Sequence, residues 1–138
     1  MKRTANAVWN GSLKEGSGKI STQSAVLNNT KYDFTSRFGD GKSTNPDELL
    51  AAAHAGCFAM ALSLILGQAG FTADSLDVTA VVNMDADKLE LTESHLALKA
   101  KIPGISKDKF MECANAAKDN CPVSKALSLK IILDAELV

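Results

Sequence analysis

Hydrophobic residues follow two different spacings along this chain, and the longest apolar run has the features of a helix. No charged residue occurs in the run Leu49–Ala73. Asn45 and Pro46 precede it, and these residue types are preferred at an N-cap and at the first helical position. We therefore predict a helix from about Pro46 to Gln68.

This run is long enough to cross a bilayer, but its composition favours a soluble helix. It is rich in Ala and Gly, it contains His54, Ser63 and Gln68, and no Lys or Arg flanks it closely. A helix that is apolar on nearly every face must be covered on every face, and a chain of 138 residues has limited surface for this. We therefore expect no membrane insertion and a second copy of the chain over part of the helix, in a homodimer.

Alternating apolar and polar residues predict strands in the second half of the chain. Residues Leu76–Met84 alternate with a period of two, and so do residues Leu127–Val138. Between them, the apolar positions of residues 89–102 change phase, which predicts a strand with a bulge near Glu93 to His95.

A second helix and three N-terminal strands complete the predicted elements. Ser106 is a suitable N-cap for a helix over about Lys107 to Asp119. Short strands are expected around Thr4–Trp9, Lys19–Thr22 and Tyr32–Phe38. The fold class is α+β, with antiparallel strands packed on two main helices in a single domain of residues 1–138.

Composition and charge narrow the range of partners. Charged residues make up 22% of the chain, the formal net charge is -1, and no basic cluster favours nucleic acid or an anionic membrane. The N-terminus is basic but lacks the apolar segment of a secretion signal, so we expect a cytoplasmic protein. Three cysteines without a repeated spacing do not indicate a disulfide framework, and they fit free thiols or one functional pair.

Two of these cysteines are the main candidates for chemistry. Cys57 lies inside the uncharged run, where apolar burial makes a thiol inert unless a cation packs against it. Cys121 precedes Pro122 at the expected start of a short helix, where backbone N–H groups favour the thiolate. The two form a candidate redox pair, although burial in the core is the commoner role of free cysteines. Cys113 is either a core residue, which is the favoured interpretation, or a competing disulfide partner.

His54 is open to two interpretations. It lies three residues before Cys57 on the same helical face, so the two could ligate a metal together with Cys121, Cys113 or His95. Paired motifs such as Cys-x-x-Cys are absent, which weakens this hypothesis. A histidine in a helix is more often a polar group with satisfied hydrogen bonds.

Several segments of the chain together resemble the OsmC/Ohr superfamily, and its osmotically inducible protein C branch in particular. Residues 45–64, which contain Ala-Ala-His-Ala-Gly-Cys-Phe around Cys57, are similar to the central helix of that family. Residues 7–11 are similar to its first strand, residues 35–38 to its arginine segment, and residues 120–124 to its second cysteine motif. The likeness covers essentially the whole chain. It implies a long buried central helix in an intertwined homodimer with both active sites at the subunit interface.

The resemblance also implies an activity, a thiol-dependent peroxidase that reduces organic hydroperoxides, and hydrogen peroxide less well. Cys57 corresponds to the peroxidatic cysteine, Cys121 to the resolving cysteine, and Arg37 to the arginine that activates the thiolate. Taken alone, Arg37 is simply a solvated arginine on a strand end. The family commonly has Glu directly after the Pro of its motif to hold this arginine. Here Asp47 stands in that place with Glu48 next, so either carboxylate could orient Arg37.

The family resemblance implies no metal, flavin or haem. The expected reductant is an external dithiol or a lipoylated protein, and stress response is the expected context. A non-catalytic protein is the alternative function, binding either zinc through His54, Cys57 and Cys121 or an apolar ligand between subunits. Peroxide-dependent loss of two thiols per chain would distinguish the two functions.

Overall fold

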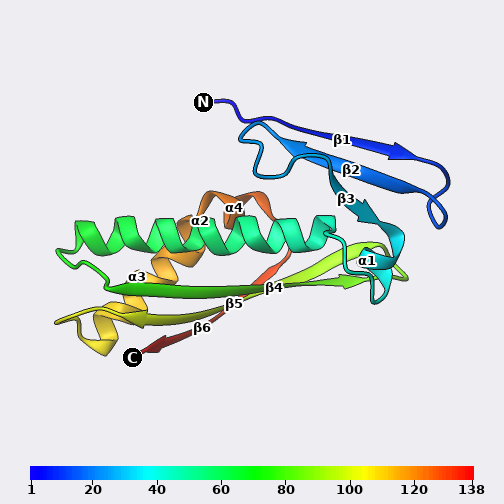
Figure 1. The fold of residues 1–138 in the computed structure, drawn as a ribbon. Coiled ribbons are helices and arrows are strands. Elements are labelled where there is room, and N and C mark those ends of the chain that lie inside the picture. The colour runs from blue at the N-terminus through cyan, green and yellow to red at the C-terminus, as the bar shows by residue number, and fades with distance from the viewer. The chain divides into compact units, whose positions relative to one another are not determined.

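The computed structural model describes residues 1–138 and divides them into two compact units, Met1–Leu49 and Leu50–Val138. The first unit contains a three-stranded antiparallel sheet in the order β1-β2-β3 (Figure 1). Its strands are β1 (Ala5–Asn10), β2 (Ser17–Thr22) and β3 (Thr30–Asp33). The sequence predicted β1 and β2 within about two residues, and the predicted third strand overlaps β3 only at Tyr32 and Asp33.

The end of β3 differs from the prediction. We expected a strand over Tyr32–Phe38, but β3 ends at Asp33 and a short helix, α1 (Phe34–Phe38), follows. The reason is local, because Asp33 is the N-cap of α1 and its carboxylate accepts a hydrogen bond from the Ser36 backbone N–H at 2.8 Å. Arg37 therefore lies on a helical turn and not on a strand end.

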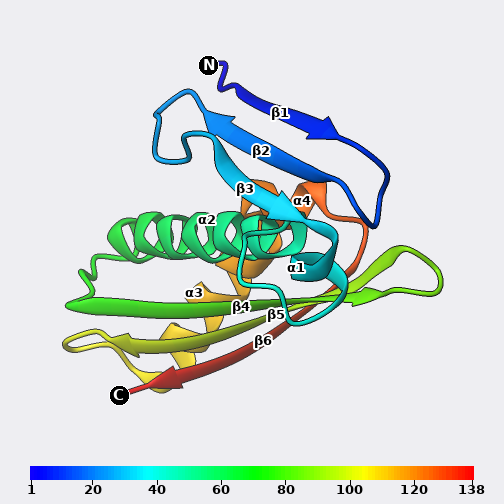
Figure 2. The same cartoon turned by 45° about the vertical axis from the view of Figure 1, so that its right-hand side comes forward.

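The second unit contains a sheet in the order β4-β5-β6 (Figure 2). As predicted, β4 (Ser75–Asp85) is antiparallel to β5 (Glu90–Lys101). In contrast, β6 (Lys130–Leu137) is parallel to β5, so the expectation of purely antiparallel strands is wrong for this pair. The crossover from β5 to β6 contains two helices, α3 (Lys107–Asn120) and α4 (Pro122–Ala126), and a long helical connection of this kind lets the next strand run parallel.

Two details of these strands also differ from the sequence pattern. The bulge on β5 leaves Thr92 unpaired, because Asn83 pairs with Glu93 and Met84 pairs with Leu91. The phase change was therefore predicted correctly, but the extra residue lies just before the predicted position. In addition, β6 begins at Lys130 instead of Leu127, since the Leu127 backbone N–H closes α4 by donating to the Val123 carbonyl.

The two long helices begin where their capping residues predict. In α2 (Pro46–Gln68), the Glu48 backbone N–H donates to Asn45 Oδ1 at 2.8 Å. In α3, the Lys109 backbone N–H donates to Ser106 Oγ at 3.2 Å. Such side-chain acceptors satisfy N–H groups that have no partner within the helix, and so they determine where the helix starts.

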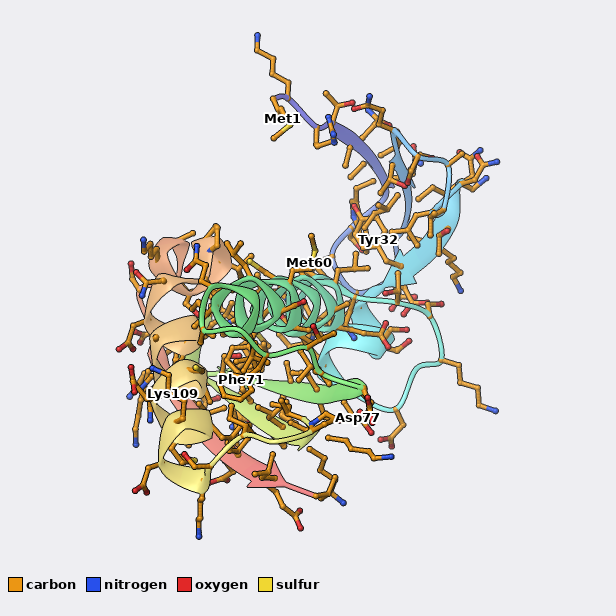
Figure 3. All side chains as sticks on the ribbon, turned by 90° about the vertical axis from the view of Figure 1, so that its left-hand side faces the viewer. Met1, Tyr32, Met60, Phe71, Asp77 and Lys109 are labelled. Carbon is orange, nitrogen blue, oxygen red and sulfur yellow. The ribbon has the colours of Figure 1, made fainter.

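The core of the second unit lies between one face of the sheet and the two helices α2 and α3 (Figure 3). The buried residues of α2 recur every four positions and form a single stripe: His54, Phe58, Leu62 and Leu66. Met60 and Leu64 lie outside this stripe and are 76% and 63% exposed. Within one chain, therefore, one face of α2 is buried as predicted and the opposite face is exposed. By length and composition alone α2 could also cross a membrane, but its buried stripe is that of a core helix.

Candidate active site

Two thiols from different elements meet in the second unit. Cys57 comes from the middle of α2, and Cys121 is the junction residue between α3 and α4. Cys57 packs against the core cluster that contains Cys121, and both are free thiols. Cys57 is partly exposed, whereas Cys121 is fully buried. The structure therefore brings together the pair that the sequence suggested, while Cys113 is buried in the core as favoured.

The surroundings of the two thiols shift their pKa values in opposite directions. Burial raises the pKa of Cys57, and so does its hydrogen bond with Cys121, against an opposing contribution from the Val123 backbone. Burial alone would raise the pKa of Cys121 as well, but hydrogen bonds from Cys57 and from the backbone and side chain of Ser124 outweigh it and lower the pKa. Within this unit Cys121 is therefore the more acidic thiol, as its position at a helix start predicts.

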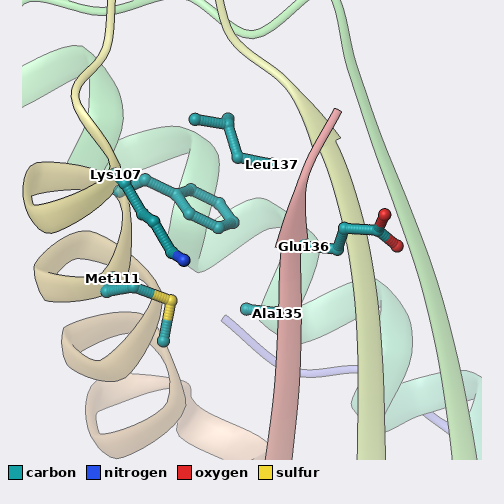
Figure 4. A pocket seen from close by; sticks show the side chains of 6 residues that line it. Lys107, Met111, Ala135, Glu136 and Leu137 are labelled. Carbon is teal, nitrogen blue, oxygen red and sulfur yellow. The ribbon is translucent and has the colours of Figure 1, made fainter.

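Cys57 opens onto an apolar groove of about 1060 Å³ between α2 and α3. The groove is lined mainly by hydrophobic side chains: Met60, Ala61, Leu64 and Ile65 from α2, and Ala116 and Pro122 from the crossover. A smaller hollow of about 270 Å³ lies between α3 and β6, next to Lys107, Met111 and Glu136 (Figure 4). No cysteine lines that hollow, so the thiol chemistry belongs to the groove beside Cys57.

Arg37 forms a bidentate ion pair in the first unit. Its Nε donates to Asp47 Oδ2 at 3.2 Å and its Nη2 donates to Asp47 Oδ1 at 3.1 Å. Glu48 is engaged elsewhere, because it accepts a hydrogen bond from Thr44 Oγ1 at 2.6 Å. The sequence left both carboxylates open as partners of Arg37, and the structure pairs Arg37 with Asp47.

The segment that carries Arg37 is held by Asp33, a residue that the sequence analysis did not single out. Asp33 Oδ1 accepts from the Ser36 backbone and from Thr35 Oγ1, and Oδ2 accepts from Ser43 Oγ at 3.2 Å. Hydrogen bonds from Ser36 are the largest of several contributions that hold the pKa of Asp33 far below its usual range. The signal in the sequence was Asp33 itself, since Asp is one of the residue types preferred at an N-cap.

His54 is fully buried, and both of its ring nitrogens are engaged. Nδ1 lies 2.7 Å from Ser94 Oγ, and Nε2 lies 2.9 Å from Ser124 Oγ. The structure does not assemble the metal site considered from the sequence, since no three His, Cys, Asp or Glu side chains are grouped to hold an ion. His95 instead contacts Asp134 at 2.6 Å. His54 is thus a polar group with satisfied hydrogen bonds.

An α+β scaffold with two neighbouring thiols beside an apolar groove defines a dithiol protein. Residues 39–136 match the model of the OsmC-like protein family, and the chain belongs to this family. It is 46% identical over 137 residues to peroxiredoxin OsmC of Escherichia coli (strain K12), covering 98% of this chain and 96% of that protein.

Other relatives agree with this assignment. The chain is 34% identical over 103 residues to organic hydroperoxide resistance protein-like 1 of Staphylococcus epidermidis, covering 72% of this chain and 74% of that one. The solved structure of the organic hydroperoxide resistance protein OhrB of Bacillus subtilis matches with a TM-score of 0.65 and 25% identity over 98% of each chain. An OsmC-like protein from Mycoplasma pneumoniae shares the fold, with a TM-score of 0.77 at 20% identity over 100% of this chain and 98% of that one. The resemblance inferred from the sequence motifs is confirmed.

Proposed function

We propose that the protein is a cysteine-based peroxidase that reduces organic hydroperoxides to alcohols. The observation that carries this proposal is the two neighbouring free thiols, Cys57 and Cys121, beside an apolar groove. Its relative at 46% identity is named a peroxiredoxin, and a second relative is named for organic hydroperoxide resistance. A partly exposed thiol next to a buried one suits an attacking and a resolving cysteine, respectively.

The proposed cycle has three steps. The Cys57 thiolate attacks the terminal peroxide oxygen, the O–O bond breaks, and the alkoxide leaves with a proton as the alcohol, so that Cys57 becomes a sulfenic acid. The sulfur of Cys121 then attacks the Cys57 sulfur, and the departing hydroxide takes up the Cys121 proton as water. An external dithiol or a lipoylated protein finally reduces the disulfide by exchange and is itself oxidised.

The groove supports a preference for organic hydroperoxides over hydrogen peroxide. Its lining is mainly apolar, so burying an alkyl or aryl group there is favourable by about 25 cal/mol per Å² of apolar surface. Hydrogen peroxide has no such group and gains nothing from these contacts. The alcohol product keeps the apolar group but loses the reactive oxygen.

Activation of Cys57 requires a cation, which we assign to Arg37. Lowering a thiol pKa from about 8.5 to about 6 takes roughly 3.4 kcal/mol. A guanidinium at about 4 Å supplies about 1 kcal/mol in water but about 4 kcal/mol at an effective dielectric constant of about 20. The assignment therefore needs a site shielded from water. Asp47 engages Nε and Nη2 of Arg37 and leaves Nη1 without a hydrogen-bond partner.

The proposed working form is a cytoplasmic homodimer of a single OsmC-like domain, with no bound cofactor. The apolar face of α2 outside its buried stripe supports the dimer, because Met60 and Leu64 are largely exposed in one chain. Exposed apolar residues grouped on one helix are typical of a subunit interface.

Peptide mapping after addition of one equivalent of an organic hydroperoxide tests the proposed function. We expect one Cys57–Cys121 disulfide per chain, reversed by a dithiol. Cys57→Ser should abolish turnover, and Cys121→Ser should allow a single turnover followed by over-oxidation of Cys57. Cys113→Ser is the matched control and should leave turnover intact. A dominant Cys113–Cys121 bridge, or no bridge, would rule out the assigned roles.

A further inference from the structure

Three buried polar side chains from three elements form a line that ends at Ser124, three residues after Cys121. Ser94 lies on β5, His54 on α2, and Ser124 on α4, with contacts of 2.7 Å and 2.9 Å between them. His54 and Ser94 are fully buried, and Ser124 is nearly so. The Ser124 side chain also helps to lower the pKa of Cys121, the N-cap residue of the same helix. Ser124 thereby links this thiol to an imidazole deep in the core.

No charged side chain takes part in this line. The only hydrogen-bond partner of the Ser94 hydroxyl is His54, which bonds to Ser124 on its other side. Burial lowers the pKa of His54, so the ring is neutral near pH 7 and carries one N–H donor and one acceptor nitrogen. The two serine hydroxyls can each donate or accept, so two arrangements of hydrogens fit the same heavy atoms.

The two arrangements match the two protonation states of Cys121. When Cys121 is a thiolate it can only accept, so the Ser124 hydroxyl donates to the sulfur and must itself accept from the His54 Nε2–H. When Cys121 is a thiol, the Ser124 hydroxyl can donate to Nε2 instead, and the Nδ1–H then donates to Ser94. That second arrangement leaves the Ser94 O–H without an acceptor, whereas the arrangement that matches the thiolate pairs every donor in the line and so avoids the cost of an unpaired buried donor.

We infer that His54 is a positioning residue for the resolving step, acting through Ser124 to hold the hydroxyl that stabilises the reactive form of Cys121. This inference rests on the proposed function, in which Cys121 attacks the sulfenic acid of Cys57. In that step the S–S bond forms, the S–O bond of Cys57 breaks, and the Cys121 proton leaves with the hydroxide as water. His54 keeps its Nε2–H throughout this step and gains no proton, because the Cys121 proton leaves with the hydroxide.

Two substitutions at His54 separate positioning from packing. His54→Phe keeps an aromatic ring but removes both nitrogens. His54→Gln keeps an amide N–H that can reach toward Ser124, so it should restore part of the effect. Ser124→Ala removes the connecting hydroxyl, and combining it with His54→Phe should add little, since both changes break the same link.

The first measurement is the pKa of Cys121, read from thiolate ultraviolet absorbance in a Cys57→Ser background without peroxide. His54→Phe should raise this pKa by about one unit, the change expected on losing a hydrogen bond to a charged sulfur. The exposed Ser63, on the same helix, supplies the control variant Ser63→Ala, which should leave the pKa unchanged. An unchanged pKa in folded His54→Phe and Ser124→Ala would overturn the inference.

The second measurement follows Cys57 oxidation and disulfide formation separately, by rapid mixing with an organic hydroperoxide. In His54→Phe the disulfide step should slow about three- to tenfold at neutral pH. The higher pKa leaves a smaller fraction of Cys121 as thiolate, and the greater nucleophilicity of that thiolate offsets the loss only in part. Cys57 oxidation should keep its wild-type rate. Equal slowing of both steps would indicate general loosening of the fold and overturn the inference. If His54→Phe does not fold, Ser124→Ala carries both measurements.

These readouts fail independently. Absence of peroxide-dependent Cys57 oxidation in the wild-type protein would refute the proposed function, whereas the pKa of Cys121 in the His54 variants would still report on the hydrogen-bonded line. Conversely, His54→Phe and Ser124→Ala could both reduce peroxide normally and form the disulfide at the wild-type rate. That result would agree with the proposed peroxidase function and would refute a role of His54 in the resolving step.

Discussion

The two units of this chain differ in how much of a core each contains. In Leu50–Val138 a cluster of twelve buried hydrophobic residues fills the space between two helices and a sheet. In Met1–Leu49 only Gly18 and Ser36 are buried, and apolar side chains such as Val8 and Val26 are exposed. A three-stranded sheet without a covered face has little hydrophobic stabilisation of its own.

This difference matters because the proposed chemistry draws on both units. The thiols Cys57 and Cys121 belong to the unit with the closed core, where packing restricts their geometry. The Arg37–Asp47 pair belongs to the other unit, where hydrogen bonds and the ion pair provide most of the local order. Truncation of core side chains in the second unit should therefore act mainly through global stability, and replacement of Arg37 in the first unit mainly through thiol reactivity.

The largest expected effect comes from truncating the core stripe of α2. Leu62 is completely buried, so Leu62→Ala should lower the free energy of unfolding by about 3 to 5 kcal/mol, through lost apolar burial and the cavity left behind. Leu64→Ala is the matched change two positions away, at a side chain that is 63% exposed in one chain. Urea unfolding at several protein concentrations is the measurement.

The two leucine variants should respond differently to dilution. If Leu64 lies at a dimer interface, Leu64→Ala should weaken association, and its loss of stability should grow as the protein is diluted. Leu62→Ala should be destabilised at every concentration. A Leu64→Ala protein that unfolds like the wild type at all concentrations would argue against α2 as part of the interface.

The next largest effect is expected at Arg37. Arg37→Ala should slow oxidation of Cys57 at neutral pH by about two orders of magnitude, because removing roughly 3 kcal/mol of thiolate stabilisation corresponds to about that factor. Arg37→Lys should rescue only in part, since an ammonium cannot bind Asp47 through a fork and also face the sulfur. The measurement is the second-order rate of Cys57 oxidation as a function of pH.

Arg3 offers a matched control for this experiment. It is exposed and hydrogen-bonds only to the neighbouring Lys2 carbonyl, so Arg3→Ala should leave the pH profile unchanged. The same unchanged profile in Arg37→Ala would mean that another group activates Cys57. A small effect on urea unfolding in both variants would agree with the different roles of the two units.

The parts of the fold that the sequence predicted are those fixed by local residues. Asn45 and Ser106 set the starts of α2 and α3 through hydrogen bonds to residues three positions later, so a sequence window contains the whole cause. The parallel direction of β6 depends on how the crossover packs across the sheet, and no local pattern reports it. The α1 turn was missed for a different reason, because Asp33 was not identified as an N-cap.

The site shows the same division. Cys57 and Cys121 were identified as a candidate pair because their surroundings in the sequence are local, and the family resemblance gave their separate roles. The choice of Asp47 over Glu48 depended on which carboxylate faces Arg37, and the two are adjacent in sequence. The line from Ser94 through His54 to Ser124 joins residues 40 and 70 positions apart, so only the fold could reveal it.

The smallest expected effect concerns pH and the segment that carries Arg37. The folded pKa of Asp33 lies well below its unfolded value of about 3.9, mainly because of hydrogen bonds from Ser36. The ionised form of Asp33 therefore adds stability at pH values above the unfolded pKa, and this contribution is lost as the pH falls through the range between the unfolded and folded pKa values.

Asp33→Asn should destabilise α1 modestly at neutral pH, and the difference from wild type should shrink in strong acid. Hydrogen exchange of the Ser36 amide across this pH range is the measurement. Asp40→Asn, at an exposed residue without a hydrogen-bonded side chain, is the control, and equal protection of Ser36 in all three proteins would show that Asp33 does not hold the segment.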